Sequence, residues 1–342
     1  MSERLSSDGT RMTVAGSRCT WRCPGVALTA LATLHAGEAH AATGAQTLCL
    51  TYLGNAGWEI RDDRHVVLVD PYVSQFREPR ASHPNGPDTV DDIAMPDERG
   101  IDAHIHAADY ILITHGHVDH LLDAPYIAAR TGAGIIGSVS VINISRARNV
   151  PEQRLIAVKG GEDYQFDGFS LRVIPSLHTP LFAKHYGSLT FAGTTLAGQA
   201  PQDLKPPLRE SAYVEGGTLA YLLRIDGHRI LITGTMNFIE RELQGLKPDV
   251  AIIGAGPSRK ESYHYAERVM HVLGNPPLVL PTHWDSWDSK SLDDALRNVR
   301  EFAAEITAAS PRTRVVIPEY FKPFGLGASA PACAAPAMLS PD

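Results

Sequence analysis

The fold of this chain is decided by the stretch Thr114-His115-Gly116-His117-Val118-Asp119-His120. It follows an apolar run at 110–114 that predicts a strand, and it precedes a helical pattern at 121–130. Three imidazoles and one carboxylate in so short a turn are the ligand types of a zinc site. Gly116 lets the turn approach a ligand closely. Because a strand-to-helix turn brings such side chains to one point, the stretch predicts a metal site.

The composition describes a chain with enough apolar residues for a sizeable core. Of the 342 residues, 44% are hydrophobic and 20% are charged, which excludes a wholly disordered chain, a coiled coil and a collagen-like repeat. The net charge is −7, and the chain has no excess of basic residues that would bind phosphates, so we expect no nucleic-acid partner. No apolar run is long enough to span a bilayer, so we expect no transmembrane segment. The oligomeric state cannot be read from the sequence.

The first residues have the pattern of a secretory leader. Arg18 and Arg22 precede a short apolar run at 26–34, and Ala39-His40-Ala41 follows it. We interpret 1–41 as a signal peptide, so the mature protein is expected in the periplasm or outside the cell. The alternative is a disordered extension, which would leave the protein in the cytoplasm.

The other end, 325–342, is rich in alanine, proline, serine and glycine and predicts a flexible tail. With both ends removed, 47–323 fits one large α/β domain, although the full length alone suggests two domains. The 4 cysteines are too few for a disulfide scaffold. Cleavage of the leader would leave Cys49 and Cys333 at opposite ends of the chain, and the sequence does not indicate whether they pair.

Between these ends, strand patterns alternate with helical ones. In the first half, strands are expected at 48–53, 65–69, 110–114, 134–137 and as a pair within 165–173, with helices at 121–130 and 139–148. In the second half, strands are expected at 218–224, 229–233, 250–254, 278–281 and 313–317, with helices at 261–273 and 292–308. The strands at 48–53 and 65–69 are expected to pair as a hairpin. Hairpins in both halves, with helices between the later strands, suggest two mixed sheets covered by helices.

The histidine stretch and its context resemble the metallo-β-lactamase-fold hydrolases, whose signature is HxHxDH after a strand. The resemblance covers residues 48–322. Thr51-Tyr52-Leu53-Gly54-Asn55-Ala56-Gly57, followed by Leu68-Val69-Asp70-Pro71, is similar to the opening of the branch that includes L-ascorbate-6-phosphate lactonase and the N-acylphosphatidylethanolamine phospholipase D. The resemblance implies an α/β fold, an αββα sandwich of two mixed sheets flanked by helices in four layers. Its metal site would lie along one edge of the sheets.

The resemblance also implies a set of ligands. Ser176-Leu177-His178 and Pro281-Thr282-His283 each follow a predicted strand and resemble the later ligand motifs. One metal ion would then be held by His115, His117 and His178, and a second by Asp119, His120 and His283. Zn²⁺ is the expected ion, with Mn²⁺ or Fe²⁺ as alternatives. Asp70 is implied as a carboxylate that supports the histidines from behind.

One expected ligand is missing. The family usually places an aspartate that bridges both ions in a strand-Gly-Asp pattern, whereas this chain reads Ile232-Thr233-Gly234-Thr235-Met236-Asn237. A neutral hydroxyl cannot neutralise two dications as a carboxylate does, so the second ion is expected to bind more weakly. A one-metal protein, a bridge from Asn237 or Glu240, and a degraded site are the open explanations. We favour weaker occupancy of the second site with activity retained.

The expected chemistry is hydrolysis of an ester, lactone or phosphodiester bond in a small-molecule or lipid-like substrate. A dication held by histidines with one open position makes a hydroxide available near neutral pH and polarises a carbonyl or phosphoryl oxygen. Asp119 and His120 are the candidate catalytic residues, because a carboxylate there can orient the water or take its proton.

The residues that flank the predicted ligands in sequence are the candidates for substrate binding; they are His185, His264, Trp284 and Asp285. Two other classes of function stay open. One is a redox member of the same fold that uses iron, and the other is a non-catalytic metal-binding protein, which the threonine at 235 would allow.

Overall fold

The strands of this chain form two sheets of seven strands each in a computed structural model, which describes residues 48–76, 92–179, 198–285, 291–326 and 333. The order in the first sheet is β14 (Pro323–Leu326), β1 (Leu48–Gly54), β2 (Gly57–Arg61), β3 (Val66–Val69), β4 (Tyr110–Leu112), β5 (Gly134–Gly137) and β6 (Leu155–Ala157). The order in the second sheet is β13 (Arg314–Val315), β12 (Leu278–Thr282), β11 (Val250–Gly254), β10 (His228–Thr233), β9 (Leu219–Ile225), β8 (Phe169–Pro175) and β7 (Asp163–Gln165). Both sheets mix parallel and antiparallel pairs, as predicted.

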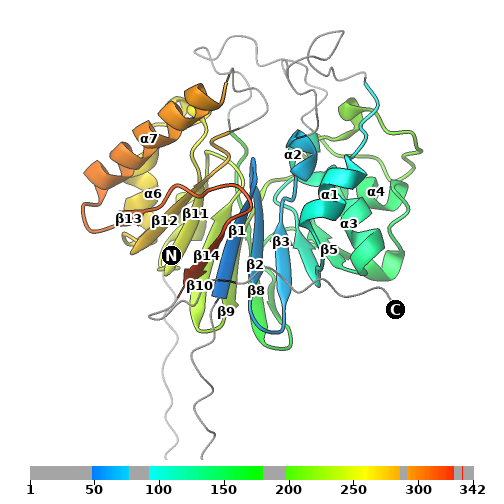
Figure 1. Cartoon of the computed structure of the whole chain (residues 1–342), viewed down its shortest axis with the longest axis horizontal. Coiled ribbons are helices and arrows are strands. Elements are labelled where there is room, and N and C mark those ends of the chain that lie inside the picture. The colour runs from blue at the N-terminus through cyan, green and yellow to red at the C-terminus, as the bar shows by residue number, and fades with distance from the viewer. Residues whose placement is uncertain (1–47, 77–91, 180–197, 286–290, 327–332, 334–342) are drawn as a thin grey trace, which may run out of the picture. The chain divides into compact units, whose positions relative to one another are not determined.

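Helices cover the outer face of each sheet (Figure 1). The helices are α1 (Glu98–His104), α2 (Val118–Leu121), α3 (Ala124–Thr131), α4 (Val139–Ala147), α5 (Glu240–Leu243), α6 (Tyr265–Leu273) and α7 (Leu292–Ala309). The single 3₁₀ turns are η1 (Val73–Phe76), η2 (Glu152–Arg154), η3 (Glu210–Ala212) and η4 (Pro257–Glu261). Helices α3 and α4 pack on β5, and α7 packs on β13 and α6. The four-layer αββα sandwich is therefore confirmed. None of the described helices is long and apolar enough to cross a membrane.

The main core fills the space between the two sheets. Alternate residues of β1, including Leu48, Leu50 and Tyr52, point inward and are 0% exposed. They meet side chains of the second sheet such as Tyr221, whose hydroxyl donates to the backbone oxygen of Ile113 at 2.7 Å. Each large apolar side chain buried in this way stabilises the fold by roughly 1.5–3 kcal/mol. The hydroxyl bond also ties the second sheet to the end of β4.

The chain direction places several loops at one edge of the sandwich. Strands β3, β4 and β5 are parallel, as are β10, β11 and β12. Strand β8 runs with β10, because both pair antiparallel with β9. Strand β9 begins beside the end of β4, where the Leu219 N–H donates to the Thr114 oxygen at 2.8 Å. The loops after β4, β8, β10 and β12 therefore meet at the same edge, and these loops carry the predicted ligands.

Two local predictions were wrong. The strands at 48–53 and 65–69 do not pair, because β2 lies between them and pairs with both. The tight turn that makes room for β2 uses left-handed backbone at Gly54 (φ 89°) and Asn55 (φ 49°). The helix predicted at 121–130 is divided into α2 and α3, because Pro125 in the first turn of α3 lacks an N–H and favours a new helix start.

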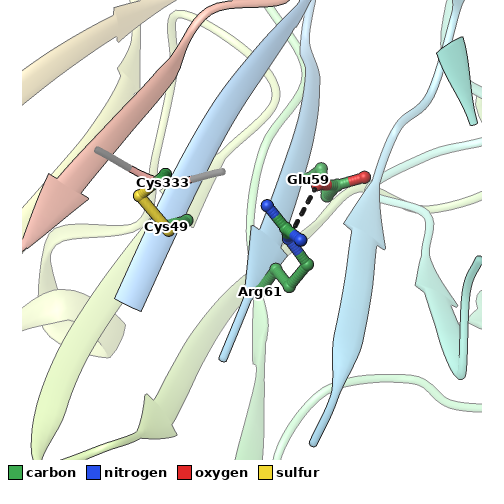
Figure 2. Close-up of a disulfide and its surroundings, with 4 residues drawn as sticks. All are labelled: Cys49, Glu59, Arg61 and Cys333. Atoms are coloured by element: carbon green, nitrogen blue, oxygen red, sulfur yellow. Dashed lines mark ion pairs between the residues drawn. A yellow bond between two sulfur atoms is a disulfide. The ribbon is translucent and has the colours of Figure 1, made fainter. Parts of the chain in front are cut away.

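The first residues of the predicted tail 325–342 belong to a strand. Strand β14 extends to Leu326 and pairs with β1, so its last residues form backbone hydrogen bonds with a strand that would otherwise be the edge of the sheet. Cys333 forms a disulfide with Cys49 of β1, with the two Cα atoms 6.0 Å apart (Figure 2). The buried Glu59 and its ion-pair partner Arg61, 3.5 Å away, lie on the neighbouring strand β2. The rest of the tail and the predicted leader 1–41 lie outside the described residues.

Candidate metal centre

Three histidines from two loops form the first cluster. His115 and His117 follow β4 and His178 follows β8, and their candidate ligand atoms all lie within 4.8 Å of one another. His115 Nε2 is 3.1 Å from His117 Nδ1. The His115 ring is buried, with 1% exposure, because β4 ends in the interior of the sandwich. The predicted grouping is thus present in space, while metal binding by it stays a prediction.

Hydrogen bonds fix which nitrogen of two of these rings can bind a cation. The Thr114 hydroxyl donates to Asp70 Oδ2 at 2.5 Å, so it can only accept from His115 Nδ1, 3.2 Å away. His178 Nδ1 donates to the carbonyl oxygen of Thr179 at 2.7 Å. In both neutral rings, the proton on Nδ1 leaves the lone pair of Nε2 available as a ligand.

The second cluster contains a carboxylate. Candidate ligand atoms of Asp119, His120 and His283 also lie within 4.8 Å of one another. Asp119 Oδ2 is 3.5 Å from His120 Nε2 and 3.4 Å from His283 Nε2. The rings of His120 and His115 have centroids 3.9 Å apart, so the two clusters adjoin. A site with two ion positions is therefore geometrically available.

Asp70 supports residues of both clusters. It follows β3 in the left-handed conformation (φ 41°) and is 0% exposed. Its Oδ1 accepts the Thr114 N–H at 2.7 Å, and its Oδ2 lies 2.8 Å from His120 Nδ1. The predicted supporting role of Asp70 therefore agrees with its contacts. Gly234 is needed here, because a Cβ at that position would lie 2.2 Å from Thr114 Oγ1.

The donor set fits a divalent cation. His120 Nε2 is buried and has no hydrogen-bond partner among the described residues, although its Nδ1 is paired with Asp70. A buried polar atom without a partner is costly, and a metal ion at this position would satisfy it. Imidazole nitrogens with one carboxylate are preferred ligands of zinc, and they also suit iron and manganese.

Burial and neighbouring charges act in opposite directions on the protonation of these residues. Burial, reinforced by the surrounding imidazoles, holds the pKa of His115 well below its usual value. Burial alone would raise the pKa of Asp119, but the charge of the His120 imidazole and the hydrogen bond from His283 outweigh burial and lower that pKa. Burial likewise opposes protonation of His120, yet the carboxylates of Asp119 and Asp70 raise its pKa. The first cluster thus favours neutral imidazoles, whereas the second pairs an ionised carboxylate with an imidazole that is more readily protonated.

Asn55 is a contact residue that the sequence did not single out. Its Nδ2 donates to the backbone oxygen of Asp119 at 2.8 Å and to Asp119 Oδ2 at 3.2 Å. The sequence offered Asn55 only as part of the opening stretch 51–57 and as a turn residue, with no sign of a contact to Asp119. Thr114 was missed for a similar reason, because threonine at a strand end is unremarkable.

Comparison with known proteins places this arrangement in a family. Residues 49–283 match the Beta-lactamase superfamily domain. This chain belongs to that superfamily. Its relatives include a UPF0173 metal-dependent hydrolase of Methanosarcina mazei, 24% identical over 273 residues that cover 79% of this chain and 95% of the relative. Another is a UPF0173 metal-dependent hydrolase of Carboxydothermus hydrogenoformans, 25% identical over 241 residues that cover 70% of this chain and 85% of the relative.

Solved structures share the superfamily fold. Igni18, a novel metallo hydrolase from the hyperthermophilic archaeon Ignicoccus hospitalis, superposes with a TM-score of 0.51 at 18% identity and covers 83% of this chain and 100% of its own. The metallo-beta-lactamase fold protein YhfI from Bacillus subtilis has a TM-score of 0.50 at 12% identity and covers 82% of this chain and 99% of its own. At these identities the likeness concerns the fold alone.

The position of the superfamily's bridging aspartate is used differently in this member. The Thr235 hydroxyl donates to the backbone oxygen of Leu177 at 2.8 Å, and Asn237 Nδ2 donates to the backbone oxygen of His178 at 3.2 Å. Both side chains therefore hold the loop that carries His178 instead of lying between the clusters. Glu240, considered as an alternative bridge, instead forms an ion pair with Arg268 at 2.7 Å, and half of its side chain is exposed.

The residues predicted to bind substrate differ in their exposure to solvent. Trp284 and Asp285, predicted to bind substrate, are only 2% and 4% exposed, so their side chains offer little surface to a substrate. The Trp284 ring packs against both Tyr52 and Tyr320, with centroids 5.8 and 5.7 Å away. Burial of this kind follows from tertiary packing and has no signature in a single sequence. His264 is exposed and lies 3.8 Å from Glu267 of its own helix, and His185 lies outside the described residues.

Proposed function

We propose that this member of the beta-lactamase superfamily is a metal-dependent hydrolase that cleaves an ester, lactone or phosphodiester bond. The observation that carries the proposal is the pair of adjoining clusters, in which six residues from the three segments that follow β4, β8 and β12 present their ligand atoms at one edge of the sandwich. Superfamily membership and relatives that are metal-dependent hydrolases support the same class of reaction.

His115, His117 and His178 would hold one ion firmly, and Asp119, His120 and His283 would hold a second ion more weakly. Zn²⁺ suits this donor set best, with Mn²⁺ or Fe²⁺ as alternatives. When bound, such an ion lowers the pKa of water and polarises the carbonyl or phosphoryl oxygen of the substrate. The weaker second position follows from the hydroxyl of Thr235, which replaces the shared carboxylate and donates to Leu177.

The residues of the chain would orient the reacting groups. Asp119 stays ionised because the neighbouring imidazoles lower its pKa, so its carboxylate can accept a hydrogen bond from the attacking water. A carboxylate with so low a pKa is a weak base, which favours the orienting role over that of proton acceptor. His120 is held by Asp70 through Nδ1, so its Nε2 keeps a fixed direction toward the site.

The substrate class is inferred from the opening turn. Residues 51–57 contribute the Asn55 contacts to Asp119, and this segment is the part that resembles the lactonase and phospholipase branch. The proposed substrate is a small molecule or a lipid-like molecule. Because Trp284 and Asp285 are buried, substrate contacts must come from other residues.

Export of the protein is supported by its disulfide. Disulfides persist in oxidising compartments and are rare in the cytosol. Cys49 and Cys333 are bonded, and both follow the proposed leader 1–41. We therefore favour a periplasmic or secreted location and a hydrolase domain that runs from 47 past 323 to the end of β14.

A panel of generic substrates tests the proposal. Purified protein loaded with Zn²⁺ should hydrolyse at least one of p-nitrophenyl esters, simple lactones and bis-(p-nitrophenyl) phosphate, and a chelator should abolish that turnover. Metal analysis should give one tightly held equivalent and a second that dialysis removes. Metal binding without chelator-sensitive turnover on any of the three classes would favour a non-catalytic metal-binding protein. Two tightly held equivalents would contradict the weakened second position.

A further inference from the structure

One asparagine outside the ligand set fixes two members of the second cluster. Besides the two bonds from Asn55 Nδ2 to Asp119, the backbone oxygen of Asn55 accepts the N–H of His283 at 2.6 Å. Asn55 belongs to the β1–β2 turn of the first sheet, whereas His283 follows β12 of the second sheet. A single residue, 0% exposed, therefore fixes a side chain of one loop and the backbone of another across the two sheets.

The backbone conformation of the β1–β2 turn sets the direction of this asparagine. Asn55 has left-handed backbone (φ 49°), a conformation that asparagine adopts more readily than most residues. Gly54 before it is also left-handed (φ 89°), and a Cβ there would lie 1.7 Å from Gln75 Nε2. His283 has left-handed backbone as well (φ 55°), and in this conformation its N–H donates to the Asn55 oxygen.

Behind Asn55 lies the buried carboxylate of Asp285. Asp285 Oδ2 accepts the backbone N–H of Asn55 at 3.3 Å and lies 3.5 Å from Gln75 Nε2. Its Oδ1 forms a short hydrogen bond with the Tyr52 hydroxyl, which is also 2.7 Å from the Asn55 oxygen. A carboxylate is costly to bury unless it is well paired. Two of the groups that pair with Asp285, the Asn55 N–H and the Tyr52 hydroxyl, belong to or contact the residue that holds Asp119 and His283.

We propose that Asn55 and Asp285 are positioning residues that set the metal affinity of the second cluster without contacting the ion. Asp285 fixes Asn55, and Asn55 fixes the Asp119 carboxylate and the His283 loop. The first cluster is held by other groups, the Thr114 hydroxyl for His115 and the Thr179 oxygen for His178. The inference rests on the proposed function only for its premise that ions bind at the two clusters.

The test titrates the metal-stripped full chain with Zn²⁺ and, separately, with Co²⁺, whose visible absorption reports the ligands of each bound ion. In Asn55→Ala, affinity for the second equivalent should fall about 10–100-fold, the usual loss when a group that orients a ligand is removed. Affinity for the first equivalent should stay within about threefold of wild type, and its Co²⁺ spectrum should not change.

A matched control and a milder variant separate positioning from a general structural effect. Asn143 on α4 is also buried and donates its Nδ2 to the Ala200 oxygen at 2.8 Å, so Asn143→Ala removes a comparable bond. It should lower the melting temperature and leave both Zn²⁺ affinities unchanged. If Asn55→Ala does not fold, Tyr52→Phe keeps the aromatic packing and removes only the hydroxyl next to Asp285. Its second-equivalent affinity should fall several-fold, less than in Asn55→Ala.

Equal losses at both equivalents, or no loss at the second in a folded variant, would overturn the positioning role. So would a wild-type protein that binds only one ion under saturating Zn²⁺. Because these readouts are binding and absorption, they are independent of turnover. If no substrate is cleaved but the second equivalent alone weakens, the hydrolase proposal fails and the positioning inference stands.

Discussion

The two clusters adjoin, yet they are held by chemically different surroundings. The first cluster contains only histidines, and its rings are fixed by a hydroxyl and a carbonyl oxygen, from Thr114 and Thr179. The second contains Asp119, and carboxylates lie behind it, Asp70 directly and Asp285 through Asn55. Carboxylates therefore contact the second cluster directly, whereas at the first cluster Glu215 acts on His178 only as a nearby charge.

This difference bears on the missing bridging aspartate. Neutral imidazoles can hold one dication without help from a shared carboxylate, as three-histidine zinc sites do. A second dication nearby is repelled by the first and needs negative charge to be retained. In this chain that charge comes from Asp119, which belongs to the second cluster, and from Asp70, which contacts His120 directly and reaches the first cluster only through Thr114. The first cluster should therefore hold its ion firmly, and the second should depend on its positioning groups.

The largest expected effect comes from removing the first cluster. His115→Ala combined with His117→Ala should reduce hydrolysis at least about 10³-fold, because the lost ion supplies several kcal/mol of transition-state stabilisation. Metal analysis of the double variant should show the loss of the firmly held equivalent. His271→Ala, an exposed histidine on α6, is the matched control and should keep wild-type turnover. Undiminished turnover in the double variant would show that the first cluster is not the reaction centre.

Removal of the disulfide should separate stability from metal binding. Cys49 lies near the start of β1, whereas the turn residue Asn55 follows the end of the same strand. Cys49→Ser with Cys333→Ser should lower the free energy of unfolding by about 2–4 kcal/mol, measured by urea denaturation. Zn²⁺ affinities at both clusters should not change. A change in Zn²⁺ affinity at the second cluster would mean that this affinity depends on the stability of β1 and not only on the contacts of Asn55.

Asp70→Asn is the variant that should weaken metal binding at both clusters. Asp70 accepts from Thr114, which orients His115, and it also lies 2.8 Å from His120 Nδ1. Zn²⁺ affinity should fall about 10–100-fold, at both equivalents instead of one. Equilibrium dialysis with Zn²⁺ measures this directly. A loss confined to the second equivalent would show that Thr114 holds His115 without help from the carboxylate.

The smallest effect is expected from Thr235→Val. It removes the hydrogen bond to the Leu177 oxygen and should lower the free energy of unfolding by about 1 kcal/mol. Affinity for the first equivalent should fall a few-fold, because the His178 loop loses one of its tethers, and the second should not change. Thr313→Val, which removes a buried hydroxyl that donates to the Pro276 oxygen at 2.8 Å, is the control for stability alone. A marked loss at the second equivalent would indicate that Thr235 acts as a bridge after all.

Several elements could be predicted because their sequence patterns are local. Strands β5 (Gly134–Gly137) and β11 (Val250–Gly254) have the predicted boundaries, since short apolar runs flanked by glycine or polar residues leave little choice of register. Strand β2 was missed, because its turn depends on left-handed backbone at Gly54 and Asn55. The division of the predicted helix at Pro125 was missed although proline carries that signal.

Burial decided which residues near the ligands are available to a substrate, and it could not be predicted. Trp284 and Asp285 follow His283 directly, so proximity in sequence suggested a pocket wall. The chain instead turns inward after β12 and stacks Trp284 against Tyr52, which comes from the other sheet. A contact between residues more than 200 positions apart leaves no trace in the composition or periodicity of either segment.

The sequence by itself determined the types and order of the candidate ligands, because HxHxDH and the two later histidines at strand ends are local patterns with a fixed chemistry. It also determined that a threonine stands at 235, where the resemblance implies a shared carboxylate. Only the tertiary structure decided what replaces it. Asn55, Thr114, Asp285 and the Cys49–Cys333 bond act through partners that lie far away in the chain. Hydrogen bonds and burial depend on three-dimensional proximity, and the sequence alone does not specify it.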